Sequence, residues 1–227
     1  MVGSKWGYRY TGDWRLDAAR QEVKDHSLAM FTTQLAESRT LLGEHLALYQ
    51  VHSLTSDSPL FADAALLRAL AGLRAGGVLV GLTTSGPDQA AALRQALDLT
   101  VDGRPLFSTA QVTWNLLEPS VDQAAAEAAS AGWAVLVKEG VANGRLTPGP
   151  APEPVTALAA ARGVTADAIA LAAALARPWA SVVLSGAVTE GQLAANLAAL
   201  TVGPLPELGL AEEPAAYWAT RAARPWQ

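Results

Sequence analysis

The chain has 227 residues, of which 51% are hydrophobic and 16% are charged, and this composition favours one large folded α/β domain over residues 1–227 rather than a disordered chain. The net charge of −5 and the aromatic content of 6% argue against nucleic acid as a partner, because no basic surface would attract phosphates. The chain has no cysteine, which excludes disulfides, thiolate metal sites and cysteine nucleophiles.

In chain order, short apolar runs rich in β-branched residues alternate with Ala- and Leu-rich stretches of helical period. This alternation is typical of a parallel sheet covered by helices. The apolar runs predict strands at Val2–Ser4, Leu46–His52, Val78–Thr83, Phe107–Val112, Ala134–Lys138 and Ser181–Leu184.

The stretches between these strands predict helices, several of them opened by a residue that can cap the first turn, such as Ser27, Asp63, Thr165 or Thr189. A last short helical segment carries Tyr217, Trp218 and Arg221, and we expect it to pack against the mouth or the side of a barrel. The main helices are expected at Leu28–Leu42, Ala62–Ala75, Asp88–Leu97, Asp122–Ala131, Val155–Arg162, Ala166–Leu175 and Glu190–Leu200.

Each strand-to-helix step suits a (β/α) barrel, but six strands are counted where a closed TIM-type barrel has eight. The fold class expected is therefore α/β, an incomplete TIM-type barrel of about six parallel strands. Two long loops, Tyr8–Lys24 and Asn143–Pro154, follow strands, where such folds place substrate and cofactor contacts.

Polar side chains occur at the ends of the first two predicted strands. Lys5 follows the first strand, and His52 and Ser53 end the second. The carboxyl ends of barrel strands are where active sites form, so these residues are the first candidates for chemistry. A solvated strand-end lysine and a hydrogen-bonded structural histidine are the alternatives.

Four segments together resemble the aldo-keto reductase family over most of the chain. They are Ser4-Lys5-Trp6-Gly7, Tyr49-Gln50-Val51-His52, Gln111 to Asn115, and Leu184 to Ala187 followed by Gln192 to Asn196. The resemblance implies a (β/α)₈ barrel that binds NADPH at the carboxyl face of its strands and reduces aldehydes or ketones to alcohols. It also implies a small-molecule carbonyl substrate as the partner.

Two catalytic residues are implied by this resemblance. Lys5 matches a lysine that stands beside a tyrosine, where an ammonium lowers the pKa of the phenol. His52 matches a histidine that orients the substrate, since a neutral imidazole can donate to the carbonyl oxygen.

Cofactor contacts are implied at further positions. Amide and hydroxyl groups would bind the nicotinamide carboxamide, and Lys138 stands where many relatives have an aromatic ring under the nicotinamide. A cation and a helix N-terminus would bind the pyrophosphate, and two polar residues on one helix face would reach the adenine. The residues are Thr83, Thr84, Gln111, Lys138, Asn143, Arg145, Ser185, Gly186, Ala187, Gln192 and Asn196.

Trp6 and Trp14 follow Lys5 and are expected to wall the substrate pocket. Metal chemistry is not expected, because the three histidines, at positions 26, 45 and 52, lack the close spacing of metal ligands. The longest apolar run, Ala168–Ala176, is too short to cross a bilayer, so we expect a cytoplasmic protein without a membrane partner.

The aspartate and tyrosine that complete the family's site lie in units before the lysine strand, and nothing in this sequence matches them. Tyr8 and Tyr10 follow Lys5 and are not equivalent to that tyrosine. Three interpretations stay open: a chain cut from a longer reductase, which we favour, a pseudo-reductase that still binds dinucleotide, or a part that completes its barrel with another chain. Open barrel edges would favour self-association, and turnover of the chain as given is expected to be weak or absent.

Overall fold

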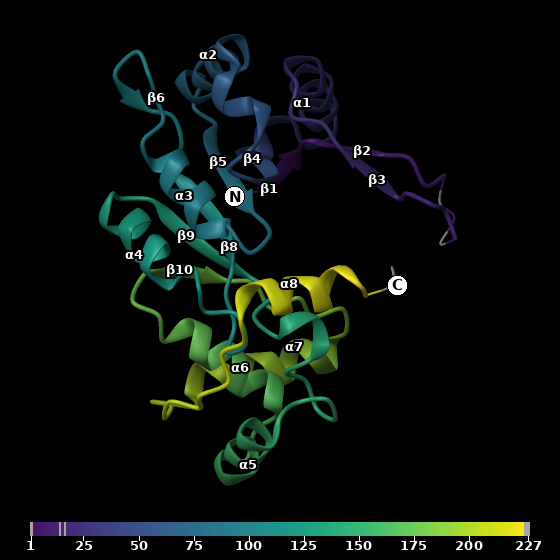
Figure 1. Cartoon of the computed structure of the whole chain (residues 1–227), viewed down its shortest axis with the longest axis vertical. Helices are drawn as coiled ribbons and strands as arrows, with labels where there is room; N and C mark the ends of the chain where they lie inside the picture. Colours follow the sequence, from purple (N-terminus) through teal and green to yellow (C-terminus); the bar gives the residue numbers. More distant parts are fainter. Residues whose placement is uncertain (1, 14, 16, 225–227) are drawn as a thin grey trace. The chain divides into compact units, whose positions relative to one another are not determined.

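The computed structural model describes residues 2–13, 15 and 17–224 (Figure 1). Contacts within the chain define two compact units, one of Met1–Ala110 with Arg224–Gln227 and one of Gln111–Ala223. Each unit contains parallel strands and the helices that cover them.

In the first unit, the strands lie in the order β1 (Val2–Trp6), β4 (Leu46–Leu54), β5 (Leu79–Thr84), and the two neighbouring pairs are parallel. Their connections carry helices, as parallel pairing requires. Helices α1 (Leu28–Leu42) and α2 (Ala64–Ala75) lie in these connections with the short 3₁₀ turns η1 (Gly43–His45) and η2 (Pro59–Ala62), and α3 (Gln89–Leu97) follows β5.

An aromatic cluster fastens α1 to its strands. The Phe31 ring on α1 lies 5.2 Å from that of Trp6 on β1 and 6.2 Å from that of Tyr49 on β4, between ring centroids. All three side chains are buried, and Phe31 is the buried residue of α1. Because aromatic side chains bury large apolar areas, this contact fixes the helix over the first two strands.

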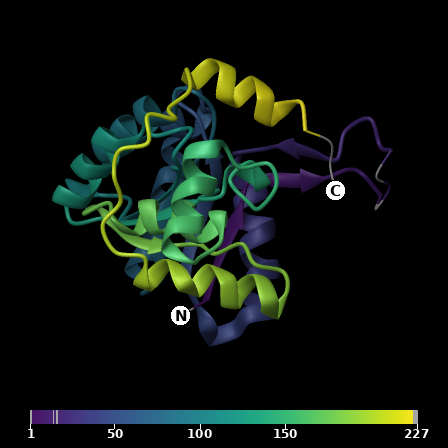
Figure 2. The same ribbon diagram turned by 90° about the horizontal axis from the view of Figure 1, so that it is seen from below.

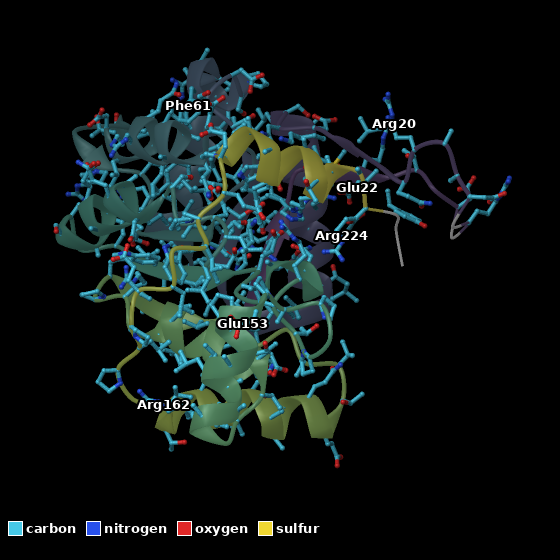
Figure 3. All side chains as sticks on the ribbon, turned by 60° about the horizontal axis from the view of Figure 1, so that its bottom comes forward. Arg20, Glu22, Phe61, Glu153, Arg162 and Arg224 are labelled. Atoms are coloured by element: carbon cyan, nitrogen blue, oxygen red, sulfur yellow. The ribbon has the colours of Figure 1, made fainter. Side chains whose placement is uncertain are left out.

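The loop predicted at Tyr8–Lys24 is in fact largely a hairpin. Strands β2 (Tyr8–Tyr10) and β3 (Glu22–Lys24) pair antiparallel, and Figures 1 and 2 show them extending away from β1 and α1. Arg20 and Glu22 project from this hairpin (Figure 3). A second small hairpin, of β6 (Thr100–Val101) and β7 (Arg104–Pro105), was also not predicted.

In the second unit, the strands lie in the order β8 (Thr109–Thr113), β9 (Ala134–Lys138), β10 (Ala180–Val183). The first two residues of β8 belong to the first unit, and β9 and β10 are parallel. The remaining elements are α4 (Asp122–Ser130), η3 (Ala142–Gly144), α5 (Glu153–Arg162), α6 (Ala166–Leu175), α7 (Glu190–Leu197), η4 (Ala198–Thr201) and α8 (Pro214–Ala222).

Helix α6 is the core helix of the second unit, because nine of its ten residues are buried. Its many alanines let neighbouring elements approach closely, and α5, η4 and α8 contribute side chains to the same cluster. At the end of α5, Arg162 donates to the carbonyls of Val202 and Pro204 (Figure 3). Among the described helices none alone could span a membrane, and only α5 and α6 together, bent by 92°, reach that length and composition.

The predicted fold class is confirmed, and each predicted strand and helix is found with small differences at its ends. Ser27, Asp63 and Thr189 cap their helices as predicted. Thr165 stands at the N-cap of α6 with an extended backbone, as predicted, but its hydroxyl is buried without a hydrogen-bond partner and makes no capping bond. In that first turn the Asp167 carboxylate accepts from the N–H of Ala168 instead, at 3.2 Å.

Candidate active site

Lys5 and His52 lie at the same end of two neighbouring parallel strands in the first unit. The register of β1 and β4 places Lys5 opposite Gln50, two residues before His52. Because side chains alternate along a strand, the side chains of residues 50 and 52 belong to the same face of the sheet. The pairing therefore brings the two predicted catalytic residues to the same end of the two strands.

His52 sits on a bulge at the end of β4. The register of β4 with β5 shifts between Val51 and Leu54, and Ser53 has a left-handed backbone with φ of 53°. Such a conformation costs a non-glycine residue about 1–3 kcal/mol and is often found at functional sites. A bulge also changes the direction in which the neighbouring side chains point, and here one of these is the imidazole of His52.

Side chains from two other elements hold the bulge in place. The N–H of Ser53 donates to Oγ1 of Thr83 on β5 at 2.7 Å, and Nζ of Lys24 on β3 donates to the carbonyl of Ser53 at 2.8 Å. Both polar groups of the Ser53 backbone are thus satisfied by side chains rather than by a ladder. Thr83, predicted to contact the nicotinamide, is fully buried and supports the bulge.

Lys5 is exposed at the end of β1, but the surrounding protein still removes part of the water from its ammonium. This partial desolvation lowers the pKa of Lys5. Its charge is therefore given up at a lower pH than that of a fully solvated lysine.

Sequence reasoning considered Tyr8 only as a match to the family's tyrosine, and it missed Lys24. Tyr8 packs edge-on against the His52 ring, with 4.9 Å between ring centroids, and Lys24 holds the bulge. Both lie in the hairpin that was predicted as a loop. The alternating polar and apolar residues of Tyr8-Arg9-Tyr10 and Glu22-Val23-Lys24 were the only local signal for these strands.

Thr84 and Trp6 are directed into the interior of the first unit. Thr84 is fully buried, and its hydroxyl donates to Oε1 of Gln89 at 3.1 Å. Trp6 is 1% exposed and lies against Phe31 and His26, so its ring belongs to the core beside α1. Trp14, the other predicted pocket residue, lies outside the described residues.

In the second unit, Gln111 and Lys138 lie on neighbouring strands. Gln111 is buried in β8. Lys138 ends β9, where its Nζ donates to Oγ1 of Thr113 at 2.5 Å, lies 3.6 Å from Oε1 of Glu139 and stands 5.8 Å from the ring centroid of Trp218. This lysine is therefore surrounded by partners of the same unit.

Helix α8 packs at the carboxyl ends of β8 and β9, in line with the predicted position of the last helical segment. Nδ2 of Asn115 donates to the hydroxyl of Tyr217 at 2.9 Å, and the guanidinium of Arg221 pairs with Glu139 at 2.7 Å. Burial raises the pKa of Glu139, but the hydrogen bonds from Arg221 and the charges of Arg221 and Lys138 outweigh burial and lower it.

The loop after β9 presents Asn143 and Arg145. Asn143 is exposed and has a left-handed backbone with φ of 52°. Arg145 forms a bidentate ion pair with Glu212 and lies 5.6 Å from the ring centroid of Tyr217. The cation predicted to meet the pyrophosphate is therefore already paired with a carboxylate from the segment before α8.

The segment after β10 is held from α7 by the two polar residues predicted for the adenine. Nδ2 of Asn196 donates to the carbonyl and the hydroxyl of Ser185, at 3.1 and 2.9 Å, and the exposed Gln192 accepts from the N–H of Val188. Gly186 has φ of 66°, and a Cβ built on it would meet no atom within 4 Å. Oδ1 of Asn196 is buried and has no hydrogen-bond partner.

Comparison with known proteins identifies the family and the fold of the chain. A model of the Aldo/keto reductase family matches residues 1–212. An aldo-keto reductase of Bacillus halodurans in its holo form is similar in structure, with a TM-score of 0.68 and 20% identity over 96% of this chain and 72% of that one. The glycerol dehydrogenase of Gluconobacter oxydans gives a TM-score of 0.66 and 20% identity, over 100% and 74% of the two chains.

At these identities the solved structures support the fold alone, which is the predicted TIM-type barrel architecture. A search of curated proteins finds no significant match. The match of the family model covers most of the sequence and includes both Lys5 and His52. This chain belongs to the aldo/keto reductase family, a family of oxidoreductases.

Proposed function

We propose that the chain reduces the carbonyl group of an aldehyde or ketone with NADPH as the cofactor. The observation that carries the proposal is the placement of Lys5 and His52 at the same end of two paired parallel strands, with His52 on a bulge fixed by other side chains. Active sites of (β/α) barrels form at this end of the strands. The absence of cysteine is compatible with a cytoplasmic location, which we propose as well.

His52 and Lys5 would act on the carbonyl oxygen. The neutral imidazole of His52 can donate a hydrogen bond to that oxygen, and the ammonium of Lys5 can stabilise the negative charge that develops on it. Both groups would polarise the C=O bond and make its carbon more electrophilic. NADPH, when bound, would supply the hydride, and solvent water would protonate the resulting alkoxide.

The second unit has groups that fit a dinucleotide. Oδ1 of Asn196 is a buried acceptor without a partner, and an exocyclic amino group such as that of adenine would satisfy it. The N–H groups from Ser185 to Ala187 precede helix α7, where a pyrophosphate would be favoured. Lys138 and Arg145 add positive charge, although Glu139 and Glu212 now compensate it.

We expect low turnover from the 227-residue polypeptide assayed alone. The resemblance assigns protonation of the product oxygen to a tyrosine that matches no residue here, and general acid catalysis contributes about 10²–10⁴-fold in typical enzymes. This same observation favours a second candidate function, a dinucleotide-binding protein without catalysis.

Two measurements on the full chain decide between these functions. Fluorescence titration with NADPH reports cofactor binding, and consumption of NADPH with a generic aldehyde reports reduction. We expect Lys5→Met and His52→Asn to bind NADPH normally and to abolish the slow reduction, while His45→Gln at an exposed position changes neither. Binding without reduction in all four proteins would favour the non-catalytic function, and a lack of binding would contradict both.

A further inference from the structure

His26 is a buried histidine, outside the predicted site, whose two ring nitrogens are both engaged. It follows β3 and precedes α1, and it is 4% exposed. Its Nε2 lies 2.9 Å from the carbonyl oxygen of His52, and its Nδ1 lies 2.8 Å from Oγ of Ser58. A carbonyl only accepts hydrogen bonds, so Nε2 carries the hydrogen, and in the neutral ring the Ser58 hydroxyl donates to Nδ1.

The end of β1 is shaped around this imidazole. The Trp6 ring meets it edge-on at 5.9 Å between centroids. Gly7 has φ of 115°, and a Cβ there would lie 2.7 Å from Cδ2 of His26 and 3.8 Å from the backbone nitrogen of His52. Only glycine combines this backbone conformation with so close an approach.

Burial favours the neutral form of the His26 ring, and the charges around it act in both directions. Burial lowers the pKa of His26 and Lys24 lowers it further, while the hydrogen bond to the His52 carbonyl and the charge of Asp25 act in the opposite direction. Asp57 and Asp63 are the other charged residues that line the adjoining cavity of 440 Å³. A neutral ring is the form in which Nε2 donates while Nδ1 accepts.

We propose that His26 is a positioning residue for His52, because its Nε2–H fixes the main-chain carbonyl of His52 at the bulge. Three consecutive backbone groups at the bulge then have a side-chain partner. His26 binds the carbonyl of His52, Thr83 binds the N–H of Ser53, and Lys24 binds the carbonyl of Ser53. The orientation of that carbonyl is coupled to the backbone dihedrals of His52 and hence to the direction of its imidazole. The consequence for catalysis rests on the proposed role of His52, but the positioning itself does not.

Side-chain ¹H–¹⁵N NMR of the full chain can test this directly, because the sequence has three histidines and one of them, His45, is exposed. A matched pair of variants separates the hydrogen bond from the volume of the ring. His26→Gln places an amide N–H near the position of Nε2, whereas His26→Met fills similar space without a donor. His45→Gln serves as the control and helps to assign the signals.

We expect His26 to show the neutral form protonated at Nε2. The His52 ring signals should move in His26→Met and stay near their original positions in His26→Gln and His45→Gln. If the chain reduces an aldehyde, kcat should fall about 10- to 100-fold in His26→Met with little change in KM, since misplacing one catalytic group has effects of this size. Unchanged His52 signals in a folded His26→Met, or equal shifts in both His26 variants, would overturn the proposal.

The parent chain keeps the test decisive if His26→Met does not fold. A neutral His26 ring protonated at Nδ1 has no hydrogen to donate to the His52 carbonyl, so that tautomer in the parent would reject the positioning role. Failure of NADPH to bind would instead contradict the proposed function and leave the NMR result intact, so the two failures are distinguishable.

Discussion

Arg145 and Glu212 form a bidentate ion pair in which Nη1 and Nη2 of the guanidinium each donate to one oxygen of the carboxylate. Arg145 is the cation that the sequence assigns to a pyrophosphate, and Glu212 belongs to the segment that leads into α8. A carboxylate bound in this way resembles the oxyanions of a phosphate in geometry and charge. The pair would therefore compete with a bound dinucleotide for the same guanidinium.

Glu212→Gln tests this competition. Removing the carboxylate leaves the positive charge of Arg145 uncompensated, so NADPH should bind more tightly, by about 2- to 10-fold. The pair is about 30% exposed on each side, so the loss of folding free energy should stay below about 1 kcal/mol. Fluorescence titration and urea unfolding measure the two effects. Glu213→Gln, at the neighbouring exposed carboxylate, should leave both unchanged, and equal affinities of the two variants would refute the competition.

Arg221→Gln should weaken the second unit in a pH-dependent way. The pKa of Glu139 is lowered in the folded protein from its ordinary value of 4.5, so the stabilisation is complete above about pH 4.5 and is lost as the pH falls through the folded pKa. Because Arg221 is 37% exposed, we expect a loss of about 1 kcal/mol at pH 7. Urea unfolding should show this difference between variant and parent at pH 7 and a smaller one at pH 3.5. A difference that grows on acidification would show that the ion pair is not its source.

The sequence predicted the elements well where they bury apolar side chains. Strand β4 and helices α2 and α6 each bury several apolar side chains, and their observed bounds agree closely with the prediction. The β2–β3 hairpin escaped because each strand has three residues, mostly polar or aromatic and exposed or half-buried. Short strands of this kind have no apolar face from which to recognise them.

The site was predicted only in part, for a similar reason. Lys5 and His52 could be proposed from the sequence because each lies near the end of a recognisable strand. The contacts of His26 with His52 and Ser58 join residues 26 and 32 positions apart, and that of Lys24 with Ser53 joins residues 29 apart. No local pattern in the sequence encodes contacts at these separations. The contacts that hold the bulge at His52 could therefore be recognised only in the three-dimensional structure.

Gly7→Ala should destabilise the first unit through its contact with His26. The new Cβ would lie 2.7 Å from Cδ2 of a buried ring, and overpacking of this kind costs about 1–3 kcal/mol beyond the strain of a positive φ. Gly77→Ala is the matched control, because Gly77 has φ of 93° with no atom within 4 Å of the added Cβ. Urea unfolding should separate the two variants, and equal losses would mean that the approach to His26 is not restrictive.

Tyr8→Phe asks whether the tyrosine that contacts His52 acts as a proton donor. The ring contact at 4.9 Å does not require the hydroxyl. Tyr8 also follows the lysine strand in the chain, whereas the tyrosine of the family precedes it. We therefore expect Tyr8→Phe to reduce an aldehyde at the same rate as the parent chain and to leave the His52 NMR signals in place. A loss of tenfold or more, with the His52 signals unchanged, would identify Tyr8 as the donor.

We propose that the apolar surface beside β10 drives self-association of the chain. Within the described strands, β10 pairs only with β9, and Leu193, Leu197 and Leu200 on α7 and η4 are 46%, 54% and 68% exposed around a cavity of 110 Å³. A strand with one unpaired edge next to a cluster of exposed leucines favours association, because contact removes both the edge and the leucines from water. Sedimentation velocity should show association that Leu197→Glu reduces. Leu41→Glu, at a residue 83% exposed on α1, is the control and should associate like the parent. If Leu41→Glu disrupts association as strongly as Leu197→Glu, the added charge rather than this surface is the cause.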